Sequence, residues 1–123
     1  MASFAGEDTL RVLRALEVPS LHTTTEEDRT VMPGYAASAD DRVAWFRAAG
    51  GAPKVMAVFA RGAHAVFNDV DRRDPVGAAA AELVLGFLQE RWQAAPARLA
   101  DWRARHAALV TRFETLGAPV RAA

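Results

Sequence analysis

Two polar segments of this chain carry residues that could together move a proton. The first is a run of three acids that ends in Glu27 and Asp28, and the second contains His64. A carboxylate that accepts a hydrogen bond from one ring nitrogen of a histidine fixes the tautomer and stabilises the imidazolium. The pattern therefore predicts an acid that orients a general base, with Asp28 and His64 as the catalytic candidates. Glu27 is the alternative acid, because sequence alone does not rank two adjacent carboxylates.

Each polar segment follows a stretch that reads as a β-strand. Residues 18–24 (VPSLHTT) are apolar and β-branched, with Pro19 at the strand entrance. Residues 54–60 (KVMAVFA) form a nearly continuous apolar run, which is typical of a strand buried on both faces of a parallel sheet. Because functional groups collect beyond the carboxyl ends of parallel strands, we expect the two strands to deliver Asp28 and His64 to one pocket mouth.

Helices are predicted on either side of these strands. Four segments show helical spacing of apolar residues, and they cover residues 7–16, 39–49, 75–92 and 97–115. Ser38 and Asp74 are suitable N-cap residues, and the two glycines at 50–51 are a helix stop signal. Strands that alternate with helices predict the α/β class, here two or so parallel strands flanked by helices, with two long C-terminal helices.

Two strands are too few for a stable sheet. They would leave Val55, Ala57, Phe59 and a backbone edge uncovered. We therefore expect residues 1–123 to form a single module that corresponds to the C-terminal portion of a larger sheet domain, with residues 97–115 as its terminal helix.

The segments VPSLHTTTEED and KVMAVFARGAHAVFND resemble the closing segments of dienelactone-hydrolase-like and esterase-like α/β-hydrolases. In that fold the acid follows a late strand, usually three residues after a glycine, and the histidine follows the last strand, usually after a glycine. Asp28 stands at the acid position and His64 at the base position, with Thr25 and Gly62 at the two glycine positions. The resemblance is clearest over residues 17–92 and implies carboxylic ester hydrolysis by a Ser–Asp–His site.

The nucleophile of such a site is missing from the sequence. The serines are Ser3, Ser20 and Ser38, and none lies in a Gly-x-Ser-x-Gly motif. The resemblance therefore implies a hydrolase-like chain that is incomplete or inactive alone, with a small ester as substrate once a partner chain supplies the serine. The alternative is a non-catalytic module that self-associates or pairs with another chain through its exposed sheet edge.

The other histidines and acids favour structural roles. His22 lies within a predicted strand and reads as a packed or hydrogen-bonded residue, whereas His106 reads as solvent-facing. His64 itself could be an ordinary loop histidine. The three histidines lack metal-ligand spacing, and the acids from Asp69 to Asp74 lack the glycine and glutamate of a calcium loop, so we expect no metal and no cofactor.

Composition narrows the classes of partner. The formal net charge is zero, which argues against a nucleic-acid surface or an anionic membrane as partner. The chain has no cysteine, which excludes disulfides and thiolate chemistry. No signal peptide and no stretch of membrane-spanning length is visible, so the expected location is the cytoplasm.

Overall fold

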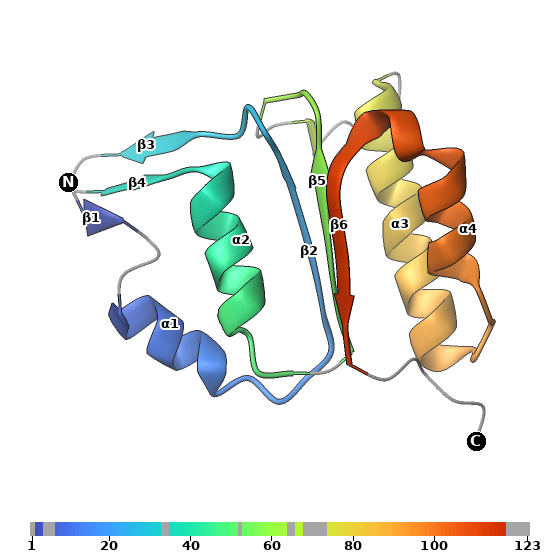
Figure 1. Cartoon of the computed structure of the whole chain (residues 1–123), viewed down its shortest axis with the longest axis horizontal. Helices are drawn as coiled ribbons and strands as arrows, with labels where there is room; N and C mark the ends of the chain where they lie inside the picture. Colours follow the sequence, from blue (N-terminus) through green and yellow to red (C-terminus); the bar gives the residue numbers. More distant parts are fainter. Residues whose placement is uncertain are drawn as a thin grey trace.

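Two small β-sheets and four helices make up the described part of the chain (Figure 1). The computed structural model describes residues 2–3, 7–32, 35–51, 53–63, 66–67 and 74–117. The elements are β1 (Ala2–Ser3), α1 (Glu7–Arg14), β2 (Ser20–Thr25), β3 (Thr30–Met32), β4 (Tyr35–Ala37), α2 (Ala39–Ala48), β5 (Lys54–Phe59), α3 (Pro75–Trp92), α4 (Arg98–Arg105) and β6 (Val110–Leu116). The protein is thus of mixed α/β content.

The larger sheet has the strand order β2-β5-β6. β2 and β5 are parallel and in register from Ser20 opposite Lys54 to Thr25 opposite Phe59. This parallel pair confirms the two strands expected from sequence, with bounds that differ by one or two residues. β6 runs antiparallel to β5 on its other side, and every residue of β5 is buried.

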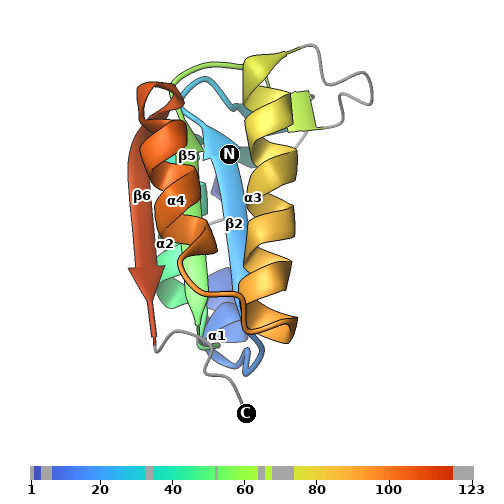
Figure 2. The ribbon, with the colours of Figure 1, turned by 90° about the vertical axis from the view of Figure 1, so that its right-hand side faces the viewer.

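The side chains of β5 alternate between two hydrophobic layers. Met56 and Val58 pack with buried residues of α2, whereas Ala57 and Phe59 pack with α3 and α4. Helices therefore cover both faces of the sheet, with α2 on one side and the α3–α4 pair on the other (Figures 1 and 2). A strand enclosed in this way accounts for the continuous apolar run of the sequence.

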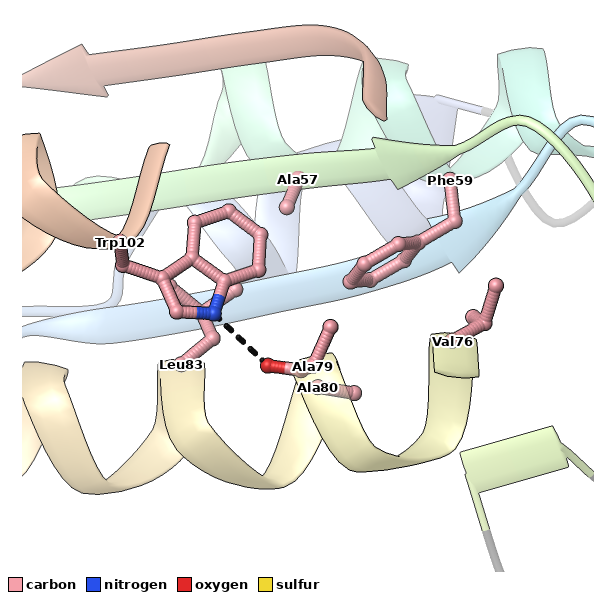
Figure 3. Packing of buried hydrophobic residues seen from close by; sticks show 7 residues of the cluster. All are labelled: Ala57, Phe59, Val76, Ala79, Ala80, Leu83 and Trp102. Carbon is pink, nitrogen blue, oxygen red and sulfur yellow. Dashed lines mark hydrogen bonds between the residues drawn. The ribbon is translucent and has the colours of Figure 1, made fainter. Parts of the chain in front are cut away.

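Trp102 connects the elements of the hydrophobic layer between the sheet and the α3–α4 pair. Its indole Nε1 donates a hydrogen bond to the backbone carbonyl of Ala79, 2.8 Å away, as Figure 3 shows. Its ring meets Phe59 edge-on, with 5.9 Å between ring centroids, and stacks on Phe113 at 5.8 Å. The side chain is almost fully buried, so it links α4 to α3 and to two strands of the sheet.

The predicted terminal helix over residues 97–115 is wrong, and so is the expectation of two long C-terminal helices. α3 is long, but α4 ends at Arg105 and a single 3₁₀ turn, Ala107–Leu109, leads into β6. The strand replaces the helix because pairing along β5 covers the backbone edge that a two-stranded sheet would expose.

The helix caps follow the sequence signals. Ser38 and Asp41 form a reciprocal capping box at the start of α2. Asp74 accepts a hydrogen bond from the backbone N–H of Val76 at 2.8 Å, and α3 spans residues 75–92 as predicted. Gly51 lies just past the end of α2 and is required by close packing, because an added Cβ would lie 1.6 Å from the carbonyl oxygen of Val18.

Lys54, the chain's one lysine, closes the C-terminal end of α2. Its Nζ donates hydrogen bonds to the carbonyls of Phe46, Arg47 and Ala49, at 2.7, 3.1 and 2.6 Å. These are carbonyls that a helix end leaves without helical partners. Burial of the ammonium lowers the pKa of Lys54.

The smaller sheet has the order β1-β4-β3, with β1 parallel and β3 antiparallel to β4. It lies beyond the N-terminal end of α2 (Figure 1). In the part of the chain described above, no helix is long and apolar enough to cross a bilayer.

Candidate active site

The loops that follow β2 and β5 are tied together at the carboxyl end of the sheet. The backbone N–H of Glu26 donates to the carbonyl of Phe59 at 2.8 Å, which extends the ladder one step past the strands. The hydroxyl of Thr25 then donates to the carbonyl of Gly62. The acidic segment and the segment that leads to position 64 therefore start side by side, as the parallel pairing predicts.

Asp28 occupies the interior of this loop pair and is only 1% exposed. Its backbone N–H donates to the carbonyl of Thr25 at 3.1 Å, which closes a tight turn over residues 25–28. Its Oδ2 accepts a hydrogen bond from the hydroxyl of Thr24 at 3.0 Å. The turn thus aims a buried carboxylate back at the end of β2.

Arg42 of α2 supplies the charge that compensates Asp28. Its Nη2 lies 3.6 Å from Oδ1 of Asp28, and its Nη1 donates to the backbone carbonyl of the same residue at 3.4 Å. The guanidinium also lies 5.7 Å from the ring centroid of Trp45. The Arg42 cation therefore offsets part of the cost of burying the Asp28 carboxylate.

The two neighbouring acids are placed differently. Glu27 is exposed. Glu26 makes a bidentate pair with Arg112 of β6, at 3.0 and 2.9 Å, and accepts from the hydroxyl of Thr111 at 2.6 Å. The Thr111 hydrogen bond, followed by the Arg112 contacts, lowers the pKa of Glu26. Glu26 therefore fastens the turn to the third strand, and of the three acids only Asp28 is buried.

His64 lies outside the described residues, so the predicted Asp28–His64 contact stays a prediction. The described chain approaches that position as far as Ala63. Gly62 adopts φ 116°, a backbone conformation that favours glycine, and accepts the Thr25 hydroxyl. The glycine in front of position 64 is thus required by the turn. Asp69 and Asp71 of the acidic run also lie outside the described residues.

A hydroxyl–imidazole pair that the sequence did not predict lies elsewhere in β2. Ser20 Oγ and His22 Nε2 share a hydrogen bond of 2.9 Å at the amino end of β2. His22 also meets the Phe46 ring edge-on at 5.4 Å, which confirms the expected packed histidine. Burial, and then the charge of Lys54, lower the pKa of His22. No carboxylate among the described residues orients this imidazole, so the pair lacks the third member of a triad.

His106 differs from its predicted solvent-facing role. It follows α4, shares a 2.9 Å hydrogen bond with Glu82 of α3, and packs against Trp102 with 5.2 Å between ring centroids. Its helix position suggested exposure, but the 3₁₀ turn that follows folds the ring onto α3. Among the described residues no cluster of three or more histidine and acidic side chains is suited to a metal ion.

The chain matches no protein-family model, no curated protein and no solved structure. What the described geometry can do chemically follows from Asp28. A buried, charge-compensated carboxylate at the mouth of two parallel strands can accept a hydrogen bond from an imidazole delivered by the neighbouring loop. It cannot itself act as the nucleophile of a serine-type reaction, which needs a hydroxyl and an oxyanion hole.

Proposed function

We propose that this chain carries the acid and the histidine of an esterase-type α/β-hydrolase site, with Asp28 as the acid and His64 as the general base. The observation that carries the proposal is the buried Asp28 carboxylate on a loop bonded, through Thr25, to Gly62. His64 follows Gly62 by two residues in the sequence, and this short separation supports the proposed pairing with Asp28.

In this proposal the chain is half of a catalytic site. Asp28 accepts the hydrogen bond of one ring nitrogen of His64, and the other nitrogen takes the proton of a serine on a nucleophile-bearing segment. The serine oxygen attacks the ester carbonyl, the alcohol leaves with the proton from His64, and water then hydrolyses the acyl-enzyme. Without the serine and the oxyanion donors, the isolated chain should turn over no ester.

The free edge of β2 is where the missing segment would attach. Among the described residues β2 pairs with β5 alone. A hollow of about 280 Å³ lies beside this edge on the α2 side, lined in part by Leu21, Trp45 and Met56. A further parallel strand beside β2 would place alternate side chains in this hollow.

The opposite face of such a strand would meet an apolar side of α3. Val84, Leu85, Leu88 and Trp92 are all exposed on that helix. Since α4 contacts α3 at Ala79 and Glu82, the 3.6-residue period turns these four side chains away from α4. Figure 2 shows α3 beyond the β2 edge, on the side away from β6. The free edge of β2, the hollow beside it and the apolar side of α3 together favour the addition of a further strand to the sheet.

The acid–histidine pair can be tested on the isolated chain by titrating the His64 ring in NMR. A carboxylate partner raises the pKa of an imidazole, so Asp28→Asn should lower the measured pKa of His64. His64→Ala identifies the signal by its loss. Glu27→Gln is the matched control, because it removes an adjacent and exposed acid, and it should leave the His64 titration unchanged.

Each outcome of this titration has a meaning. A shift in Glu27→Gln with none in Asp28→Asn would transfer the acid role to Glu27. No shift in either variant would remove the acid–histidine pair and the hydrolase proposal with it.

Activity is tested by complementation. The chain is mixed or co-expressed with a Gly-x-Ser-x-Gly segment encoded upstream or in a neighbouring gene, and hydrolysis of p-nitrophenyl acetate is followed. Complemented activity should depend on His64 and on Asp28, while the Ser20→Ala variant should keep it. Normal turnover in a folded His64→Ala variant would contradict the assignment.

The exposed apolar side of α3 also favours a second candidate function, a non-catalytic module that self-associates through the β2 edge. In that case the isolated chain forms a defined oligomer in light scattering, and Leu85→Glu makes it monomeric. The matched control is Val12→Glu, which places the same charge at an exposed apolar position of α1. A monomer at all concentrations would exclude this function.

A further inference from the structure

A cavity of about 440 Å³ lies at the end of the larger sheet opposite to Asp28. Its lining comes from the start of β5, the end of β6, the last turns of α3 and the first turns of α4. Because β6 is antiparallel to β5, the beginning of one strand and the end of the other meet here. The cavity is therefore separate from the candidate active site, and its size is that of a small-ligand pocket.

The walls of this cavity are apolar. Val55 of β5, Phe113 of β6, Phe87 of α3 and Leu99 of α4 contribute side chains from four elements. Such a wall favours a hydrocarbon group, which gains free energy by leaving water.

Two arginines supply the cationic groups of the cavity, because the ammonium of Lys54, which also lines it, is bound to the carbonyls at the end of α2. Arg91 of α3 and Arg103 of α4 both line it. The Nε atom of Arg91 is buried and has no hydrogen-bond partner, and it is the one side-chain atom in this state among the described residues. Neither guanidinium forms an ion pair with a described carboxylate, and Arg103 lies over the Phe113 ring at 5.2 Å from its centroid. A buried N–H donor without an acceptor is costly, and an anionic acceptor would satisfy it.

Glu90 is the acidic residue in the lining, and its carboxylate is already used. Its Oε2 accepts a hydrogen bond from the backbone N–H of Leu99 in the first turn of α4. Glu90 thus holds the two helices together at the cavity rim. Two guanidiniums against one engaged carboxylate leave the cavity positive, which disfavours a cationic ligand and favours an anionic one.

We propose that this cavity binds a small amphiphilic carboxylate, with its hydrocarbon chain against Phe87, Leu99 and Phe113 and its carboxylate on Arg91 and Arg103. Guanidinium groups are well matched to carboxylates, because their N–H donors engage both oxygens. The proposal does not depend on the hydrolase assignment, since it involves neither Asp28 nor the loop that contains His64.

Octanoate is the probe for the experiment, with 1-octanol as the neutral analogue of equal chain length. The full chain is titrated with each compound by NMR, and backbone shifts near Leu99 and Phe113 are followed. We expect saturable octanoate binding with a dissociation constant below about 1 mM, and binding of octanol at least about tenfold weaker.

Charge variants assign the anion contact. Arg91→Gln and Arg103→Gln should each weaken octanoate binding about tenfold or more. Arg98→Gln is the matched control, because Arg98 is an exposed arginine of α4 outside the cavity lining, and it should bind octanoate as the parent chain does. Ala100→Trp serves as a second variant, since Ala100 is exposed and lines the cavity, and the larger ring should block binding without loss of the fold.

Three results would overturn the proposal. The first is the absence of saturable binding up to about 5 mM octanoate, which is near the weak limit of a specific site. The second is equal binding of octanol and octanoate. The third is octanoate binding that Arg91→Gln and Arg103→Gln leave unchanged. None of these results bears on the His64 titration, so the two proposals fail separately.

Discussion

The hydroxyl of Thr25 donates a hydrogen bond to the backbone carbonyl of Gly62, and this contact joins the turn that holds Asp28 to the loop that leads to His64. Thr25 is fully buried, so water cannot replace the hydrogen bond between its hydroxyl and Gly62.

Removal of this hydroxyl should loosen the joint between the two loops. Thr25→Val keeps the shape of the side chain but leaves the Gly62 carbonyl without its donor, at a cost of about 1–3 kcal/mol in the free energy of unfolding. Urea denaturation measures the loss. Thr25→Ser retains the hydroxyl and should lose less stability than Thr25→Val, and the reverse order would show that the methyl group matters more than the hydrogen bond.

The backbone at Gly62 should resist substitution. Its φ of 116° is rarely adopted by other residues, and a Cβ there would lie 3.2 Å from the Val66 side chain. We expect Gly62→Ala to lower the free energy of unfolding by about 1–3 kcal/mol. Gly86→Ala is a control of opposite sign, because Gly86 is helical and an added Cβ meets Arg98 only at 3.7 Å. That change should stabilise α3 by about 0.5–1 kcal/mol. Equal effects at the two glycines would contradict the backbone argument.

Loss of the Lys54 cap should weaken the end of α2. Lys54→Met keeps the aliphatic stem and removes three hydrogen bonds to buried carbonyls, so the free energy of unfolding should fall by about 1–3 kcal/mol. Arg47→Met removes an exposed cation of α2 that is paired with Glu114, and it should lower the free energy of unfolding by less than about 1 kcal/mol. Thermal unfolding of both variants tests the difference, and a larger loss in Arg47→Met would refute the capping role.

His22 should make the fold sensitive to mild acid. Burial lowers its pKa below the ordinary value of 6.5, so below that pH the unfolded chain binds a proton that the folded chain does not. The contribution of His22 to stability is therefore complete above pH 6.5 and is lost as the pH falls below it. His22→Phe should flatten the pH dependence of urea unfolding between pH 7.5 and 5.5, about one unit on either side of the ordinary histidine pKa. An unchanged slope would remove His22 as its source.

The parallel strand pair could be predicted because its signals are local. KVMAVFA is apolar at every position but one, and β5 has helices on both faces. The last strand could not be predicted in this way. Val110, Phe113 and Leu116 are spaced by three, which fits a helix better than the period of two expected for a strand. The strand arises because β6 pairs along β5, with a register irregularity next to Phe59, and no local pattern contains that partner.

The candidate acid was likewise predictable in part, from local sequence signals, and in part not. The position of the acidic run after β2 followed from the strand order, but the ranking of the acids did not. Asp28 is buried and Glu27 exposed because the turn over residues 25–28 directs Glu27 outward and Asp28 back toward β2. The Arg112 contact that engages Glu26 comes from a strand that the sequence did not predict.

The position of β6 has a consequence for synthesis of the protein on the ribosome. β5 is the central strand, yet the neighbour that covers one of its edges is made of residues 110–116, more than fifty positions later. Until those residues emerge from the exit tunnel, an apolar strand has an open backbone edge that is available to other nascent chains. We expect stalled or shortened products that end before Val110 to aggregate or to be bound by chaperones, whereas chains that extend past Leu116 escape both fates.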